Sequence, residues 1–146
     1  MTGWRIQNVA WDAQRDALLD IRYRVFVDEQ GVPAELEHDA QDALALHLLA
    51  RTLDGIPFAT ARMLDDGHIG RIAVLPAWRG RGVGSALLEA LIGIAHRRGI
   101  PAVYLHAQCR AEAFYRRLGF VAEGAIFDDA GIAHRRMSLR LPAHDG

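Results

Sequence analysis

A glycine-rich loop between a predicted strand and a predicted helix constrains this chain more than any other feature. The loop 79–85 reads RGRGVGS, with glycine at Gly80, Gly82 and Gly84 and arginine at Arg79 and Arg81. After it, apolar residues repeat with helical spacing from Val83 to His96. Glycine permits positive φ and close approach of backbone N–H groups, and a helix N-terminus carries roughly half a positive charge. The loop therefore predicts a phosphate-binding or pyrophosphate-binding site.

Two common anion-binding loops do not fit this segment. A P-loop requires lysine before Ser or Thr, but all seventeen basic residues of this chain are arginine. A dinucleotide fingerprint requires glycine where this chain has Leu87, and the segment 76–78 separates the strand from the loop. The absence of lysine also excludes Schiff-base chemistry.

Length and composition predict one globular domain spanning residues 1–146. The 146 residues are 51% hydrophobic and 24% charged, and the net charge of −1 does not favour nucleic acid as a partner. No apolar run approaches the roughly 18 residues of a membrane span, and the N-terminus lacks a signal-peptide core, so we expect a cytoplasmic protein without a membrane partner. A single cysteine, Cys109, excludes an internal disulfide and gives no zinc-ligand spacing, so no metal is expected.

Hydrophobic periodicity predicts an α+β fold with a mixed, largely antiparallel sheet and flanking helices. The predicted strands are 4–11, 44–53, 58–64, 68–75, 101–108, 120–127 and 132–141, with a hairpin turn at Asp54-Gly55 and another at 128–131. The predicted helices are 12–26, with Asp12 as its N-cap, 83–96 and 111–118. The acidic segment 28–43 is predicted as a loop with at most one turn of helix.

Several motifs together resemble the GNAT family of acetyl-CoA-dependent N-acetyltransferases. The stretch 79–84 looks like the R/Q-x-x-G-x-G/A loop that this family wraps around the pyrophosphate of coenzyme A. The stretch AEAFYRRLGF (111–120) is similar to the family's A-x-x-L/F-Y-x-x-x-G-F pattern. The outer stretches RYRVFVDEQGVP and FDDAGIAHRRM look like the ElaA-like branch of the family.

The resemblance implies where the cosubstrate acetyl-CoA binds. In the family two parallel strands splay apart, and the pantetheine arm lies between them; here these strands are RIAV and VYLHAQ. The implied contacts are the backbone of Ile72, Ala73 and Val74, the loop residues Arg79, Gly80, Arg81, Gly82, Val83, Gly84 and Ser85, and further along the chain Gln108, Ala111 and Phe114. For Phe114, packing in the short helix is the favoured role.

The resemblance also implies a proton donor, Tyr115, which would protonate the departing thiolate; anchoring of the short helix is the structural alternative. The base that deprotonates the amine is not implied, because Gly70 and Arg71 stand where many family members have a carboxylate. Glu29 is the leading candidate, followed by His106 and then His68, and each is equally compatible with a structural role. For His134, packing at a strand end and a functional role are evenly matched.

The predicted activity is transfer of an acetyl group from acetyl-CoA to a primary amine, by direct attack in a ternary complex. The acceptor is a small-molecule or peptide amine, and Arg62 and Arg71 are candidates to meet an acidic group on it. A relay through Cys109 has no partner histidine at a suitable spacing. The alternative is a noncatalytic acyl-CoA-binding or regulatory module on the same fold. Homodimers are common in the family, and the sequence leaves the oligomeric state open.

Overall fold

The computed structural model describes residues 3–37 and 39–143. The strands are β1 (Trp4–Val9), β2 (Leu46–Thr52), β3 (Pro57–Met63), β4 (Ile69–Val74), β5 (Ala102–Gln108), β6 (Val121–Asp129) and β7 (Ile132–Arg140). The helices are α1 (Trp11–Arg22), α2 (Ala34–Glu37), α3 (Val83–Arg97) and α4 (Glu112–Arg117). A π-helical segment, Tyr23–Glu29, extends α1, and short 3₁₀ turns lie at Ala40–Ala43, Pro76–Trp78 and Cys109–Ala111. This order confirms the predicted α+β class.

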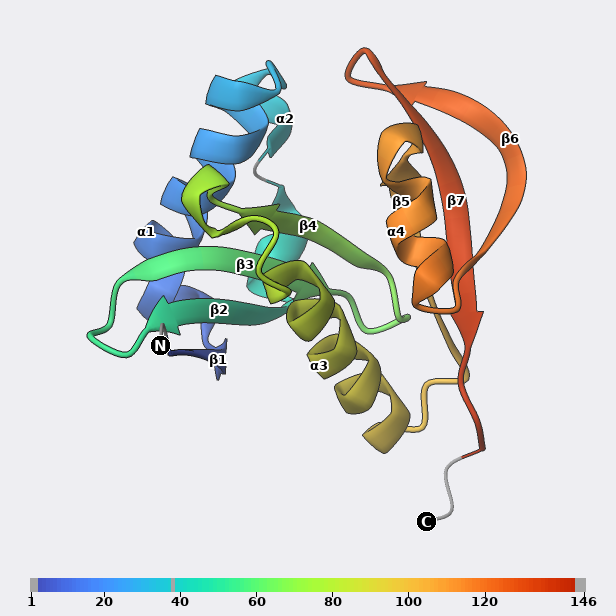
Figure 1. Cartoon of the computed structure of the whole chain (residues 1–146), viewed down its shortest axis with the longest axis horizontal. Coiled ribbons are helices and arrows are strands. Elements are labelled where there is room, and N and C mark those ends of the chain that lie inside the picture. The colour runs from blue at the N-terminus through green and yellow to red at the C-terminus, as the bar shows by residue number, and fades with distance from the viewer. Residues whose placement is uncertain (1–2, 38, 144–146) are drawn as a thin grey trace.

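The strands form two sheets rather than one continuous sheet. The first has the order β1-β2-β3-β4 and the second β5-β7-β6, and every pairing within them is antiparallel. Among the described residues the sheets are joined by one isolated parallel bridge, between His68 and Tyr104, where the Tyr104 N–H donates to the Gly67 carbonyl at 3.0 Å. Beyond that bridge β4 and β5 diverge (Figure 1). The splayed parallel strands implied by the family resemblance are therefore present.

Helices cover both faces of the first sheet. Residues of β2 alternate between the faces: Leu48 packs in the cluster that includes Leu87 and Leu91 of α3, and Leu49 packs in the cluster that includes Leu18 of α1. All five of these leucines are at most 2% exposed. Burial of one such side chain stabilises the fold by about 1.5–3 kcal/mol. Helix α3 also packs on β5 and so joins the two sheets.

The first helix differs from its predicted limits at both ends. It begins at Trp11 with Ala10 as N-cap, and no side chain caps it, so the prediction of Asp12 as N-cap is wrong; Asp12 is an acid in the first turn. At the other end the helix continues through a π-helical segment to Glu29 and ends before Gly31, which has φ +76°. The Gln30 N–H bonds to the Val25 carbonyl at 3.1 Å, five residues back.

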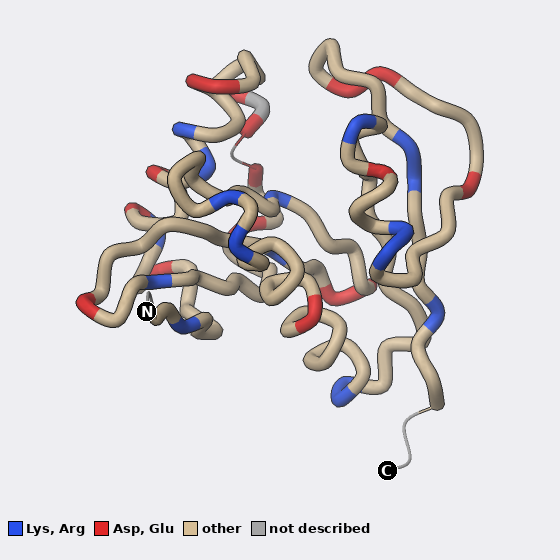
Figure 2. Tube along the Cα trace, viewed as in Figure 1, with Lys and Arg blue, Asp and Glu red and all other residues tan. Residues whose placement is uncertain are grey.

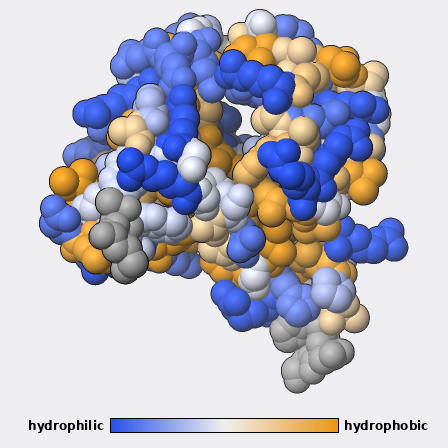
Figure 3. All heavy atoms as spheres, viewed as in Figure 1, coloured by the Kyte–Doolittle hydropathy of each residue, from blue (hydrophilic) through white to orange (hydrophobic). Residues whose placement is uncertain are grey.

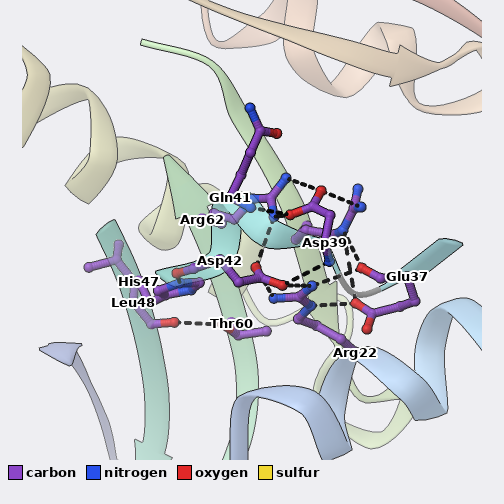
Figure 4. A network of polar contacts seen from close by, with 10 residues as sticks. Arg22, Glu37, Asp39, Gln41, Asp42, His47, Leu48, Thr60 and Arg62 are labelled. Atoms are coloured by element: carbon purple, nitrogen blue, oxygen red, sulfur yellow. Dashed lines mark hydrogen bonds and ion pairs between the residues drawn. The ribbon is translucent and has the colours of Figure 1, made fainter. Parts of the chain in front are cut away.

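The acidic segment is more ordered than predicted because buried ion pairs hold it. Arg22, fully buried at the end of α1, bonds to Glu37 and also donates to Asp42 at 2.8 Å (Figure 4). Arg62 on β3 donates to Asp39 and Asp42, each at 2.8 Å. These ion pairs therefore hold α2 and the 3₁₀ turn that follows it against α1 and β3. The sequence pattern does not show these pairs, since the partners lie 15 to 23 residues apart.

Charged residues of both signs are spread along the chain. Residues of both signs occur in both halves of the molecule (Figure 2), in keeping with the net charge of −1. No helix in the described ranges is both long enough and apolar enough to span a bilayer. The space-filling surface is hollowed between the two halves (Figure 3), on the side where β4 and β5 diverge.

Candidate active site

A cleft of about 580 Å³ opens where β4 and β5 diverge. Ile72 and Val74 of β4 line one side of it, and Gln108, Ala111 and Phe114 line the other. Between them lie the glycine-loop residues Arg79, Gly80, Gly82, Val83, Gly84 and Ser85. The structure thus brings together at one cleft eleven residues that the sequence predicted as cofactor contacts.

Two of the predicted contacts are not among the residues that line the cleft. Ala73 is 1% exposed and packs in the core beside α1; its implied contact is through backbone atoms and stays a prediction. Arg81 does not line the cleft, and its guanidinium lies 5.0 Å from the centre of the Trp78 ring. Trp78 itself lines the cleft, so Arg81 supports one wall of it.

Two of the three glycines in the loop have the positive φ that glycine permits, whereas Gly84 lies within α3. Gly80 and Gly82 adopt φ of +74° and +80°, and Gly82 is the N-cap of the 15-residue helix α3. The first N–H groups of a helix have no acceptor within it, and no acidic side chain lies in the first turn of α3. This helix N-terminus therefore faces the cleft as an uncompensated donor set suited to a phosphate.

Arg79 and Glu29 form an ion pair at the cleft. The two nitrogens Nη1 and Nη2 of Arg79 each donate to a carboxylate oxygen of Glu29 at 2.6 Å, and Nε donates to the Val74 carbonyl at 2.9 Å. The hydrogen bond from Arg79 lowers the pKa of Glu29, and the same bond raises the pKa of Arg79. A pyrophosphate would compete with Glu29 for this guanidinium. The lowered pKa makes Glu29 a weaker proton acceptor than an ordinary glutamate.

A second, smaller pocket of about 150 Å³ adjoins the cleft. Gln30 and Gln108 line both spaces, and the Gln108 amide N–H donates to the Gln30 side-chain oxygen at 2.9 Å. Arg110 in turn donates to the Gln108 side-chain oxygen at 2.9 Å. The remaining polar walls of this second pocket come from Glu37, Arg71, Asp129 and His134. The glutamine pair is therefore the boundary across which groups bound in the two spaces would meet.

Arg71 reaches the second pocket from an unusual backbone conformation. Its φ is +50°, in the left-handed region that few non-glycine residues adopt, and the pairing of β4 with β3 shifts register around it. Its Nε donates to the Glu37 carbonyl at 3.0 Å. Burial lowers its pKa, with repulsion from Arg62 and Arg22 as the next cause. Arg62 and Arg71 were both candidates to bind an acidic group on the acceptor. Arg71 lines this pocket, whereas Arg62 is 5% exposed and pairs with Asp39 and Asp42.

The two aromatic residues of α4 have different positions. Phe114 lines the cleft, and its ring lies 3.6 Å from where a Cβ on Gly84 would stand. Tyr115 is half-buried, with ring centroids 5.1 Å from Phe114 and 5.9 Å from Phe120, and it is not among the residues that line the cleft. Burial raises the pKa of Tyr115 to about 12, so its hydroxyl keeps the proton at neutral pH.

The histidines considered as bases lie where the two sheets meet, with His106 on β5 and His68 directly before β4. The His106 ring stands between His68 and Phe127, with centroid distances of 4.9 Å and 5.3 Å, and it lines neither the cleft nor the second pocket. Burial lowers the pKa of His106, followed by repulsion from Arg136. Cys109 lies in the 3₁₀ turn that follows β5.

The sequence did not point to several residues of the site. Gln30, Trp78, Arg110 and Asp129 line one or both spaces. They come from a helix end, two turns and a strand end that no local motif marks as a site. Among the described residues, no group of three or more His, Cys, Asp or Glu side chains is placed to hold a metal ion.

Comparisons with known proteins agree with this geometry. A sequence profile of the acetyltransferase (GNAT) domain matches residues 9–141. The uncharacterized N-acetyltransferase YjcF of Bacillus subtilis is 38% identical over 122 residues, which cover 80% of this chain and 86% of YjcF. The crystal structure of Escherichia coli ElaA has a TM-score of 0.79 and 32% identity, covering 94% of this chain and 99% of that one. An acyl-CoA N-acyltransferase from Pseudomonas aeruginosa has the same scores and coverage. This chain therefore belongs to the GNAT family of acetyltransferases, on its ElaA-like branch, and is an acyltransferase.

Proposed function

We propose that the protein transfers an acetyl group from acetyl-CoA to a primary amine, with the two substrates bound at the same time. The observation that carries the proposal is the pair of adjoining spaces. The large cleft has an anion-binding helix N-terminus and two diverging strands, which suit a pyrophosphate and a pantetheine arm. The second pocket meets it at Gln30 and Gln108, and the carboxylate of Asp129 in its lining suits an ammonium group.

Direct attack follows from this arrangement. An amine in the second pocket reaches the thioester at the glutamine boundary, so no covalent enzyme intermediate is required. The C–N bond forms as the C–S bond breaks, and the coenzyme A thiolate leaves. Tyr115 is the proposed donor of the proton that this thiolate takes up.

Turnover across an amine panel tests the proposed function. The panel contains polyamines, amino acids, aminoglycosides, peptides with free N-termini and lysine-containing proteins, each incubated with acetyl-CoA. Release of free thiol together with an acetylated amine, identified by mass spectrometry, is expected for at least one class. Saturable binding of acetyl-CoA without transfer to any amine would instead favour the noncatalytic acyl-CoA-binding or regulatory module.

Gly82→Asp should abolish binding of acetyl-CoA. The new carboxylate would stand at the N-terminus of α3, where it repels a pyrophosphate and occupies its donors. Wild type should melt at a higher temperature as acetyl-CoA is added, because the ligand binds only the folded state, whereas the variant should show no such shift.

Gly82→Ala is the matched control for this substitution. Alanine at φ +80° strains the backbone as aspartate does, and its Cβ would meet no atom within 4 Å. Unlike aspartate, it adds no charge. A large part of the acetyl-CoA shift should survive in Gly82→Ala. If acetyl-CoA raises the melting temperature of Gly82→Asp as much as that of wild type, the loop is not part of the binding site.

A further inference from the structure

We infer that His134 is the group that takes the proton from the acceptor's ammonium ion. The inference rests on the proposed function, because it assigns a role within that reaction. His134 is the third residue of β7 and lines the second pocket, together with Glu37, Arg71 and Asp129. An amine must lose a proton before it can attack a thioester, so a proton acceptor is needed on the acceptor side of the glutamine pair.

One hydrogen bond fixes the state of the His134 ring. Nδ1 lies 2.7 Å from the Ile132 carbonyl oxygen. A carbonyl oxygen can only accept, so Nδ1 carries the proton in the neutral ring and Nε2 carries the lone pair. The bond to Ile132 is the only hydrogen bond that the ring makes to the described residues. Nε2, the nitrogen that can accept a proton, therefore makes no hydrogen bond to another described residue.

Packing holds the ring in this orientation. His134 is 9% exposed, and its ring stacks on Phe127 of the neighbouring strand β6 with centroids 5.9 Å apart and planes at 23°. On its other side β7 pairs with β5, where Gln108 is directly opposite His134. Directly opposite residues of an antiparallel pair share one face of the sheet. His134 thus stands beside the glutamine that separates the two spaces.

The other charged groups around the second pocket are less suited to this role. The carboxylate of Glu37 is committed to Arg22, and it is 3% exposed. Asp129, at the end of β6, can attract an ammonium ion but is a much weaker base than an imidazole. Arg71 on β4 remains charged and cannot accept a proton. His106 on β5 is close enough for His134 to lower its pKa, yet it lines neither space.

The proposed step balances as follows. The ammonium gives one proton to Nε2, and the resulting imidazolium keeps its Nδ1–H bond to the Ile132 carbonyl. The free amine attacks the thioester carbon, the C–N bond forms and the C–S bond breaks. The nitrogen then gives its second proton to water, and the thiolate takes one proton from Tyr115, which regains it from water. The imidazolium returns its proton to water, so one proton is released in each turnover.

His134→Asn tests this step. Asparagine can place an N–H near the position of Nδ1, which preserves the bond to Ile132, but it cannot accept a proton. Two acceptors with the same carbon skeleton are compared at neutral pH: ethylamine, which is an ammonium ion there, and 2,2,2-trifluoroethylamine, which is uncharged. We expect the variant to lose about 10²–10⁴-fold in turnover with ethylamine. The loss with trifluoroethylamine should be at least roughly tenfold smaller, because that amine has no ammonium proton to remove.

The outcomes separate this inference from the proposed function. Equal losses of turnover with both amines in His134→Asn would overturn the assignment of His134. A loss of turnover with ethylamine alone in Glu29→Gln or His106→Asn, and not in His134→Asn, would overturn it as well. So would long-range ¹H–¹⁵N NMR spectra of the wild-type protein that place the proton of the neutral ring on Nε2. If wild type acetylates neither these two amines nor any member of the panel, the proposed function itself fails. Unchanged acetyl-CoA stabilisation in His134→Asn shows that the variant is folded.

Discussion

Asp42→Asn should lower the free energy of unfolding by about 3–5 kcal/mol, the cost typical of removing one partner from a buried ion pair. Asp42 is fully buried and accepts hydrogen bonds from both Arg22 and Arg62, at 2.8 Å in each case. The amide removes the negative charge and leaves two buried guanidinium groups less compensated. Urea unfolding followed by circular dichroism measures the change.

Asp16→Asn on the exposed side of α1 is the matched control, and its unfolding free energy should stay close to that of wild type. A change of less than about 1 kcal/mol in Asp42→Asn would mean that these ion pairs add nothing to stability.

Acid should weaken the fold through the same residue. The hydrogen bonds from Arg22 and Arg62 outweigh burial and lower the pKa of Asp42 from its ordinary 3.8 to about 2. A carboxyl whose pKa is lower in the folded state stabilises the fold above its unfolded-state pKa, and this contribution disappears as the pH falls through the folded-state value. The wild-type unfolding free energy should therefore decrease between about pH 4 and pH 2, and part of this decrease should be absent in Asp42→Asn.

Tyr115→Phe should lower turnover by about 10²–10⁴-fold while acetyl-CoA still stabilises the protein. The ring contacts with Phe114 and Phe120 remain in the variant, and only the hydroxyl is lost. Because the pKa of Tyr115 is about 12, the hydroxyl is a proton donor throughout the neutral range. Steady-state release of free thiol measures the turnover, and melting curves with acetyl-CoA measure binding.

Tyr104→Phe is the control for loss of a tyrosine hydroxyl. The Tyr104 hydroxyl bonds to Asp66 and lies outside both spaces, so turnover should stay at the wild-type level. Wild-type turnover in Tyr115→Phe would contradict the proposed proton donation and leave Tyr115 as a structural aromatic.

The glycine-rich loop at the cleft was predictable from sequence because its determinants are local. The positive φ values of Gly80 and Gly82 follow from the identity of the residues. The helix that starts at Val83 follows from the spacing of apolar residues, and its N-terminus then provides the donors. The order of the elements along the chain and the hairpin turn at Gly55, with φ +92°, follow from the same kind of pattern.

The second pocket was decided by contacts between residues far apart in the chain. Glu29 and Arg79 are 50 residues apart, and Gln30 and Gln108 are 78 residues apart. Periodicity places a residue on a face of its own element, but it does not say which side chain of another element will stand opposite. The sequence therefore determined the fold class and the glycine-rich loop before α3. The tertiary structure alone paired Glu29 with an arginine, set two glutamines between the two spaces, and brought His134 into the second pocket with Nδ1 held by a backbone carbonyl.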